Sequence, residues 1–595
     1  MNISDNRVFL TLPPPFGFYC FILNCDHLHF GLWPEDNATA SMEDAQENMF
    51  NYLLSFFPPP PAKVLDVGCG LGLSAFYISQ KGYKVTAIAP SPEMIDYAKQ
   101  KYGDSEVEFK ELSFFDEDEV FSPGLYDVLF IQESAQYLSS LNDVFRKARR
   151  LLKDKGSIIL GDEVCYDRSI KHETAVHLSS DFIIDFAENG FHITEHQKIG
   201  KLVFPTCEFI IKKFTENYDR IVSESNKPDT REKLLLYLNG WKKQKSWYEK
   251  GQMGYELFVA RKDNFFMKSY APSDEYNILT MFNKVFHVNR TLDHWYWKFR
   301  DNPYGSYKIS EVFSEEGVLV AHYAGYPVPF YFSLDKRKNF LSYQIGDTMT
   351  SPDVRNIGRG RTGILARMSY YFYAKFCEGR VPFIYGFNTA NIKKLGMRYL
   401  GYTYIDPVTL WVKDIAKDPF KPLSRIKRLF SGYSVKEIHS ISDELDAFFN
   451  RVCDFYIFLV RRDSTYLKWR YLECPDRIHR IFAVYKRGNI VGWSVFVEKE
   501  KKIIWGDALF DSRYLEAAKF MLSSLFTKEF SGYECIEGWF PQHPEWWVHQ
   551  LKRLGFTPTD EPNNLTPGFV IFEEPIRLEK LKKYLYYTMG DSDLF

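Results

Sequence analysis

From Lys63 onward the chain alternates short apolar runs with longer amphipathic ones, and this rhythm constrains the fold more than any other feature. The apolar runs KVLDVG, KVTAIA, VEFKEL, YDVLFI and SIILGD are separated by segments of helical length. Strands and helices that alternate in this way build a parallel sheet with helices on both faces. The sequence therefore predicts an α/β domain over residues 1–263, with a long helical stretch from Phe204 to Trp247 before the last strand, GYELFVARK.

A glycine-rich turn, DVGCGLG, follows the first of these strands and opens a helix. Glycines at such a junction permit a tight turn and the close approach of a ligand to the backbone, and the helix N-terminus faces that ligand. Taken alone, the turn is weak support for a binding site, because glycine turns are common in α/β folds. The order of the surrounding elements favours the interpretation as a nucleotide-type site.

The stretch VLDVGCGLG resembles the S-adenosylmethionine loop of class I methyltransferases, and the resemblance extends from about His27 to Lys262. HFGLW before the sheet and QESAQYL after the fourth strand are similar to the small-molecule branch of that family. The resemblance implies a Rossmann-like fold, S-adenosylmethionine as cofactor and a small acceptor enclosed by a lid. Nicotinamide dehydrogenases, the nearest alternative, normally carry G-x-G-x-x-G and no equivalent of QESAQYL.

By this resemblance the cofactor is held at the ends of the first four strands, with the glycines along its methionine part and Asp66 orienting the loop or the amino group. Two positions depart from the family pattern. Ala89 replaces the acidic residue that usually binds the ribose, so that backbone groups, Ser91 or Glu93 would hold it, and Ser113 stands where an aspartate often caps the adenine. Reduced affinity or a pseudoenzyme remains the alternative. The implied cofactor residues are Asp66, Gly68, Cys69, Gly70, Gly72, Ala89, Pro90, Met94, Ser113, Phe114 and Gln132.

Candidate catalytic residues follow the fourth strand, where open α/β sheets place their reacting groups. Methyl transfer is an in-line displacement that needs proximity, alignment and sometimes a base for the acceptor proton. Glu133 is the leading candidate for that base, and His29, on the segment expected to cover the cofactor, is the second. Tyr137 completes the candidate catalytic set.

The remainder of the chain contains an internal repeat. WKFRDNP, from Trp297 to Pro303, matches WRYLECP, from Trp469 to Pro475. IKKLGM and LKRLGF form a second matching pair further along each copy. Two related units of about 150 residues therefore follow one another. We expect domains over residues 264–416 and 431–595, joined by a linker over 417–430.

The first copy carries Arg-x-x-Gly-x-Gly between a strand and a long helix, an arrangement whose backbone N–H groups can hold a pyrophosphate. It resembles the coenzyme A loop of the GNAT acyltransferases, which implies acetyl-CoA or another acyl-CoA as a ligand. Ile392 stands where many members have an acidic tyrosine, so no catalytic acid is carried over. The second copy lacks the loop and is expected to be a degenerate GNAT-like repeat. The implied acyl-CoA residues are Arg355, Asn356, Ile357, Gly358, Arg359 and Gly360.

Composition excludes several other classes of function. Lysine plus arginine number 75 against 77 aspartate plus glutamate, so no global field would attract a nucleic acid. The nine cysteines show no zinc-ligand spacing, and we expect no metal. The N-terminus lacks a basic start followed by an apolar core, and no apolar stretch reaches the roughly 18 residues of a membrane span. We therefore expect a cytoplasmic location, no membrane insertion and no particular protein partner.

These observations together predict a bifunctional enzyme that methylates a small molecule and acylates the same or a related product. Two alternatives remain open. The GNAT pair could be a catalytically silent acyl-CoA sensor or docking surface for the methyltransferase. It could instead transfer aminoacyl or peptidyl groups, as some tandem GNAT folds do, although the near-neutral charge disfavours binding to transfer RNA.

Overall fold

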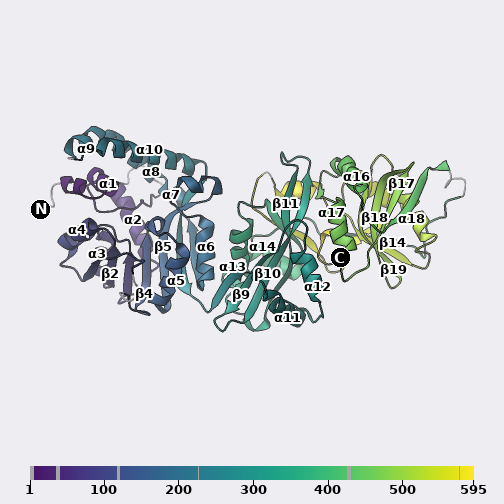
Figure 1. Ribbon diagram of the computed structural model, residues 1–595, viewed down its shortest axis with the longest axis horizontal. Helices are drawn as coiled ribbons and strands as arrows, with labels where there is room; N and C mark the ends of the chain where they lie inside the picture. The colour runs from purple at the N-terminus through teal and green to yellow at the C-terminus, as the bar shows by residue number, and fades with distance from the viewer. Residues whose placement is uncertain (1–5, 35–40, 117–120, 226, 425–429, 575) are drawn as a thin grey trace. The chain divides into compact units, whose positions relative to one another are not determined.

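A computed structural model of the chain describes residues 6–34, 41–116, 121–225, 227–424, 430–574 and 576–595. The chain divides into two compact units, Met1–Met267 and Lys268–Phe595, drawn in purple to blue and in teal to yellow (Figure 1). No helix in these described ranges is long and apolar enough to cross a lipid bilayer.

The N-terminal unit is built on a seven-stranded sheet with the strand order β3-β2-β1-β4-β5-β7-β6. Strands β1 to β5 are parallel, and β7 runs antiparallel to both of its neighbours. The order reverses between β1 and β4, and open α/β sheets bind ligands at the carboxyl ends of the strands beside such a reversal. The strands are β1 (Lys63–Val67), β2 (Lys84–Ala89), β3 (Val107–Glu111), β4 (Tyr126–Gln132), β5 (Leu152–Cys165), β6 (Phe191–Lys198) and β7 (Met253–Lys262).

Helices cover both faces of this sheet because successive strand side chains point to opposite sides. Val64 packs in one apolar cluster with residues of α2 and α3, and Leu65 packs in another with residues of α5 and α6. Ser41 begins α2 with a reciprocal cap, in which its Oγ accepts from Asp44 N and Asp44 accepts from Ser41 N. The helices are α1 (Phe16–Leu23), α2 (Met42–Leu54), α3 (Leu73–Gln80), α4 (Pro92–Tyr102), α5 (Leu141–Leu151), α6 (Ser179–Glu188), α7 (Gly200–Val203), α8 (Pro205–Glu216), α9 (Tyr218–Glu224) and α10 (Thr230–Glu249).

Helices α1, α8, α9 and α10 form an additional layer, which lies along the upper edge of the unit in Figure 1. Helices α8, α9 and α10 of this layer correspond to the helical stretch expected before the last strand. Its apolar cluster includes Phe21, Phe214 and Leu234, and also Leu71 and Met94, which follow β1 and β2. The layer therefore covers the carboxyl ends of these strands.

The C-terminal unit contains a nine-stranded sheet, whose main path is β13-β22-β12-β11-β10-β16-β23, and a seven-stranded sheet, β15-β17-β18-β19-β20-β14-β21. The strands of the first are β8 (Phe265–Ser269), β9 (Lys308–Ser314), β10 (Leu319–Phe332), β11 (Asn339–Thr350), β12 (Phe383–Asn388), β13 (Thr403–Tyr404), β16 (Phe458–Val460), β22 (Thr566–Ile571) and β23 (Leu585–Tyr586). Those of the second are β14 (Thr409–Asp414), β15 (Tyr433–Ile438), β17 (Arg480–Lys486), β18 (Asn489–Lys499), β19 (Lys502–Phe510), β20 (Cys535–Trp539) and β21 (Thr557–Asp560). The helices are α11 (Asp274–Phe286), α12 (Leu292–Trp295), α13 (Ile364–Phe372), α14 (Ala390–Tyr399), α16 (Glu444–Val452), α17 (Ser464–Leu467), α18 (Ala517–Phe526), α19 (Glu545–Arg553) and α20 (Leu578–Tyr584).

The two sheets exchange strands. β14 precedes the second repeat in the chain, yet it lies between β20 and β21 in the seven-stranded sheet. β22 comes from the end of the second repeat, yet it lies between β12 and β13 in the nine-stranded sheet. Each sheet therefore needs a strand from the other repeat to be complete.

The two repeated motifs face each other in the C-terminal unit. The rings of Trp297 and Trp469 stack with their centroids 5.4 Å apart. The indole nitrogen of Trp297 donates to the main-chain oxygen of Trp469 at 2.7 Å, and that of Trp469 donates to the oxygen of Trp297 at 2.9 Å. This reciprocal pattern indicates a local twofold relationship between the two copies of the motif.

Candidate active site

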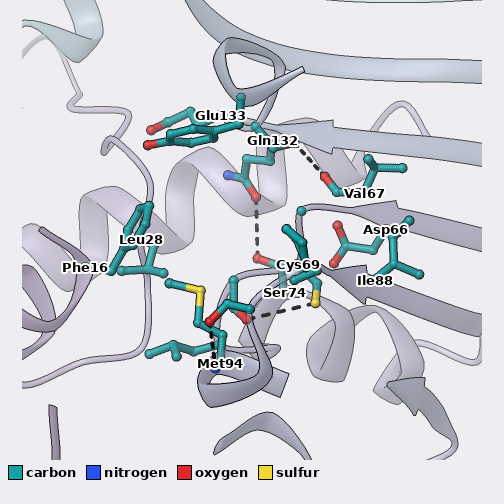
Figure 2. Close-up of a pocket in the computed structure, with 18 of the residues that line it drawn as sticks. Phe16, Leu28, Asp66, Val67, Cys69, Ser74, Ile88, Met94, Gln132 and Glu133 are labelled. Atoms are coloured by element: carbon teal, nitrogen blue, oxygen red, sulfur yellow. Dashed lines mark hydrogen bonds between the residues drawn. The ribbon is translucent and has the colours of Figure 1, made fainter. Parts of the chain in front are cut away.

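Two cavities with shared lining residues lie at the carboxyl ends of the central strands, and Figure 2 shows residues that line the first of them. The first cavity has a volume of about 330 Å³ and is lined mainly by residues that follow β1 to β4. The second cavity has a volume of about 370 Å³ and is lined largely by α1, α8, α10 and the segment around His29. Both are in the size range of small-molecule sites. Six residues line both cavities: Phe16, His27, Leu28, His29, Glu133 and Tyr137.

The structure places nearly all of the predicted N-terminal ligand residues around the first cavity. Gly72 is the exception. A Cβ on Gly72 would lie 2.6 Å from the ring of Phe109 and 2.9 Å from Ala98, so this glycine serves the packing of the loop against β3 and α4. The predicted cofactor residues that line the first cavity are Asp66, Gly68, Cys69, Gly70, Ala89, Pro90, Met94, Ser113, Phe114 and Gln132.

Close contacts within the protein explain two of the three glycines in the loop, Gly68 and Gly72. Gly68, Gly70 and Gly72 have φ angles of 79°, 55° and 84°, in the left-handed region that favours glycine. A Cβ on Gly68 would lie 2.4 Å from Ser134 Cβ, a contact with protein where the sequence had suggested a contact with ligand. At Gly70 the nearest atom is the end of the flexible Leu28 side chain, at 3.0 Å. Gly70 is therefore the position of the three where an added side chain would extend into the cavity.

Two polar side chains in the wall of the first cavity have atoms without partners. Asp66 Oδ2 and Gln132 Nε2 are buried and have no hydrogen bond within the described part of the chain. Burial raises the pKa of Asp66 to about 7. Leaving such groups unsatisfied costs about 1–3 kcal/mol each, so a ligand with an ammonium group for Asp66 and an acceptor for Gln132 would be stabilised here. These residues fit the amino-acid part of S-adenosylmethionine.

Ala89 and Ser113, which depart from the family pattern at the expected ribose and adenine positions, both line the first cavity. Ala89 and Ser91 both line the first cavity, whereas Glu93 is exposed and lies outside its lining. Ser91 Oγ donates to the Glu93 carboxylate at 2.8 Å. Of the two side chains considered as substitutes for the missing acidic residue, Ser91 is thus the one in position. Ser113 also lines the cavity, and its backbone N–H donates to Asp116 at 2.7 Å.

Glu133 lies at the junction of the two cavities, directly after β4. Its backbone has a φ of 51°, a conformation that costs energy for a residue with a side chain and is frequent at functional sites. The Oε1 atom of Glu133 accepts hydrogen bonds from Phe30 N at 2.8 Å and from the Tyr255 hydroxyl at 3.0 Å. Burial and the nearby carboxyl groups of Asp162 and Glu163 raise its pKa well above the usual range.

The other two candidate catalytic residues also lie at this junction but differ in character. His29 Nδ1 is 2.9 Å from the main-chain oxygen of Phe30, and His29 Nε2 is 3.1 Å from His27 Nδ1. Both ring nitrogens are therefore engaged, and burial lowers the pKa of His29 to about 3, which makes it a poor base. Tyr137 is 63% exposed, and its ring contacts that of Phe16 edge to face.

Comparison with known sequences identifies the family of the N-terminal unit. Residues 65–160 match the profile described as a methyltransferase domain, and the strand order of the sheet agrees with it. This unit contains a class I methyltransferase domain. An O-methyltransferase, resE of Aspergillus sclerotiorum, is 26% identical over 203 residues, which cover 31% of this chain and 76% of that protein. The glycine/sarcosine/dimethylglycine N-methyltransferase of Actinopolyspora halophila is 27% identical over 193 residues, and the match spans only 33% of its length. Among solved structures, the [4+2]-cyclase SpnF covers 43% of this chain at 18% identity, with 93% of its own chain covered and a TM-score of 0.36.

The methyltransferase domain also has two functional candidates that the sequence reasoning missed. Asp162 and Glu163 lie near the end of β5, beside Glu133, and both are buried. Asp162 accepts from Ala135 N at 2.8 Å, and Glu163 accepts from Tyr248 and Gln244. Burial raises the pKa of Asp162 to about 8 and that of Glu163 to about 7. The signal was present in the sequence as two acidic residues, GDE, that follow an apolar strand without a break.

The predicted acyl-CoA residues, 355–360, form a loop between β11 and α13 in the C-terminal unit, and 355–359 are exposed. Gly358 and Gly360 have φ angles of 72° and 61°. A Cβ on Gly358 would lie 2.3 Å from the main-chain oxygen of Thr362, so only glycine fits the turn. Ile392, at the position of the missing acid, is 47% exposed on α14.

Proposed function

We propose that this protein is a bifunctional small-molecule tailoring enzyme whose N-terminal unit transfers a methyl group from S-adenosylmethionine to an acceptor in the second cavity. The observation that carries the proposal is the junction of the two cavities at Glu133, His29 and Tyr137. A donor in one cavity and an acceptor in the other would meet there, and such alignment supplies most of what an in-line methyl transfer requires.

A small acceptor is supported by the size of the second cavity and by the elements that form its walls. Gly31 N and the Trp33 indole both donate to Thr206 Oγ1, which attaches the HFGLW segment to α8. Helix α10 contributes Tyr237 and Trp241 to the lining of this cavity. The name of one relative is consistent with this, since glycine and sarcosine are small molecules. Robust methylation of intact protein or nucleic acid would contradict this part of the proposal.

The second activity is acyl transfer from acyl-CoA by residues 264–416. Strands β10 and β11 are antiparallel, and β11 then leads through the glycine loop and α13 into β12, which is parallel to it. β11 and β12 pair at only two positions, Tyr343 with Ile384 and Gln344 with Tyr385, so they diverge beyond them. Diverging parallel strands next to an exposed glycine loop favour an acyl-CoA site. In the second repeat, 431–595, β19 and β20 pair at four positions and no such loop follows β19.

Assays of the full chain distinguish the proposed acyltransferase from its two alternatives, a sensor and an aminoacyl or peptidyl transferase. Transfer of an acyl group from CoA to any small acceptor would support the enzyme. Binding of acyl-CoA without turnover, together with a change in methylation rate, would support a sensor. Binding of charged transfer RNA would support aminoacyl or peptidyl transfer. Mass spectrometry of ligands that survive purification should recover adenosyl and CoA species together.

The sharpest test of the methyltransferase assignment is the substitution Gly70→Val. Valine is strained at a φ of 55°, and its side chain would extend toward Leu28 in the first cavity. We expect S-adenosylmethionine binding to be lost while the thermal transition of the protein remains cooperative. Calorimetry of the wild type and the variant measures this, and equal affinities would overturn the assignment.

A further inference from the structure

The second cavity combines acidic groups with aromatic walls. Glu133 and Glu163 both contribute to its lining, and no lysine or arginine of the described residues does. The histidines that reach it, His27 and His29, are kept neutral because burial lowers their pKa values to about 4 and about 3. The cavity therefore carries an excess of carboxyl groups with no cationic side chain in its lining to balance them.

The hydrogen bonds of these two glutamates leave acceptor capacity in the cavity. Glu133 receives Phe30 N and the Tyr255 hydroxyl on Oε1, and Glu163 receives Gln244 and Tyr248, also on Oε1. Within the described part of the chain, Oε2 of neither residue receives a hydrogen bond. A carboxylate can accept about four hydrogen bonds, so each glutamate has room for a donor from a ligand.

The position of Glu163 indicates that the carboxyl groups of the second cavity serve the acceptor and not the cofactor. Glu133 lines both cavities and would also lie near a sulfonium group, whereas Glu163 lines only the second. The charge of a cofactor in the first cavity therefore leaves the position of Glu163 unexplained. A cation in the second cavity would explain it, because burying an unpaired carboxylate is costly and pairing removes that cost.

Aromatic rings complete the environment. Tyr19 and Trp241 meet edge to face at 5.9 Å, and the Trp241 indole donates to the Tyr19 hydroxyl at 2.9 Å, which fixes the orientation of both rings. Phe16, Tyr137 and Tyr237 also line the cavity. Faces of such rings attract ammonium groups by about 0.5–2 kcal/mol each.

We infer that the methyl acceptor is an aliphatic amine that is cationic in solution, held between the carboxyl groups of Glu133 and Glu163 and the aromatic walls of the second cavity. This inference rests on the proposed methyl transfer, and it names N-methylation as its chemistry. A cation beside the two glutamates favours their ionised forms and pairs with them, whereas a neutral alcohol gains no such pairing and a carboxylic acid adds a further negative charge.

Before methyl transfer the acceptor must lose a proton, and Glu163, in the lining of the second cavity, can accept it. The ammonium group of the acceptor gives one proton to the Glu163 carboxylate, which leaves a neutral amine with a free electron pair. That pair forms the new nitrogen–carbon bond as the carbon–sulfur bond breaks and its electrons remain on sulfur. The product leaves as the methylated ammonium ion. Burial raises the pKa of Glu163 to about 7, which suits it to accept a proton near neutral pH.

The first test compares matched ligands on the full-length wild type. 2-Phenylethylamine and 2-phenylethanol share a skeleton and differ in charge, as do choline and 3,3-dimethylbutan-1-ol. With S-adenosylhomocysteine bound, calorimetry should show each cation binding at least about tenfold more tightly than its neutral partner. A panel of primary and secondary amines, each with its matched alcohol, should take up labelled methyl from S-adenosylmethionine on the amines.

Equal or tighter binding of the alcohols, methylation of alcohols alone, or no binding by any amine would overturn the inference while leaving methyl transfer intact. Failure of the wild type to bind S-adenosylmethionine or S-adenosylhomocysteine would instead overturn the proposed function, and the inference with it.

The second test replaces one carboxylate. Glu163→Gln preserves shape but removes the charge, so the preference for amine over alcohol should fall by about tenfold. Affinity for S-adenosylhomocysteine should remain within about twofold, which shows that the variant is folded, because Glu163 does not line the first cavity. Glu106→Gln, at an exposed position outside both cavities, is the matched control and should change neither value. An unchanged amine preference in Glu163→Gln would contradict the role of this carboxylate.

Discussion

Burial sets the charge of the acidic residues in the methyltransferase domain. Asp66, Asp162 and Glu163 lie at the carboxyl ends of central strands, where desolvation disfavours their ionised forms and raises each pKa. None of the three has a lysine or arginine within ion-pair distance in the described part of the chain. Their ionisation therefore depends on what binds beside them.

This dependence predicts how cofactor affinity changes with pH. Asp66 has a pKa of about 7 in the free protein, and an ammonium group beside it would favour the ionised form. Below pH 7 a proton must leave Asp66 on binding, so affinity for S-adenosylmethionine should fall by up to about tenfold per pH unit as the pH decreases from 7 to 6. Above pH 8 the affinity should level off. Calorimetry across this range measures the slope.

Asp66→Asn provides the control. It should bind S-adenosylmethionine more weakly than the wild type at pH 8 and should lose most of the slope between pH 6 and 7. A slope that persists unchanged in Asp66→Asn would assign the titration to another group.

The sequence patterns predicted where the candidate site residues lie better than they predicted why each residue type is needed there. The glycine turn and Glu133 were found because they follow strands whose apolar runs are unmistakable. Gly68 and Gly72 were expected to make room for a ligand, and the structure shows Ser134 and Phe109 in that space instead. The acidic residues of GDE were visible in the sequence, but the burial of Glu163 was not, because it depends on Tyr248, which lies on a helix 85 residues further along the chain.

At the scale of elements, the segment from β11 through the glycine loop to α13 carries the second proposed activity. The loop conformation is set by Gly358, which has a φ of 72° and approaches Thr362 too closely for any side chain. The sequence predicted this strand, loop and helix in order, and also the helical layer over the second cavity. Both are local patterns of polarity and glycine spacing that need no knowledge of distant contacts.

Gly358→Asp should abolish acyl-CoA binding, because it strains the turn and adds a negative charge beside the expected pyrophosphate. Gly317→Asp is the matched control, since Gly317 also has a positive φ, of 78°, but a Cβ there would meet nothing within 4 Å. Calorimetry with acetyl-CoA or coenzyme A measures both. Full affinity in Gly358→Asp would show that the loop does not bind the phosphates.

At the scale of the whole molecule, the C-terminal unit is interlocked. β22 completes the sheet of the first repeat by pairing with β12 at six positions, and β14 completes that of the second by pairing with β20 at five. The repeat itself was readable from the matching motifs around Trp297 and Trp469. The exchange was not, because strand partners so distant in sequence leave no local periodicity to detect.

The exchange predicts that residues 264–416 cannot form a stable unit alone. The edge of β12 would lose β22, and β14 would have no sheet to join, which exposes strand edges that promote aggregation. Residues 264–595 should be soluble and bind one acyl-CoA per chain. Size-exclusion chromatography with light scattering and calorimetry measure these outcomes. A soluble, monomeric 264–416 fragment would refute the interdependence, and two equivalent CoA sites in 264–595 would refute the degeneracy of the second repeat.

The exchanged strand β22 also sets the timing of folding during synthesis. β12 leaves the ribosome about 180 residues before β22, an interval of roughly 10–40 s at ordinary elongation rates. During that interval β12 and β13 lack the strand that pairs with both, so the nascent chain is a candidate client for chaperones that shield unpaired strands. A pause in translation within the second repeat would lengthen this exposure, whereas release of the finished chain would end it.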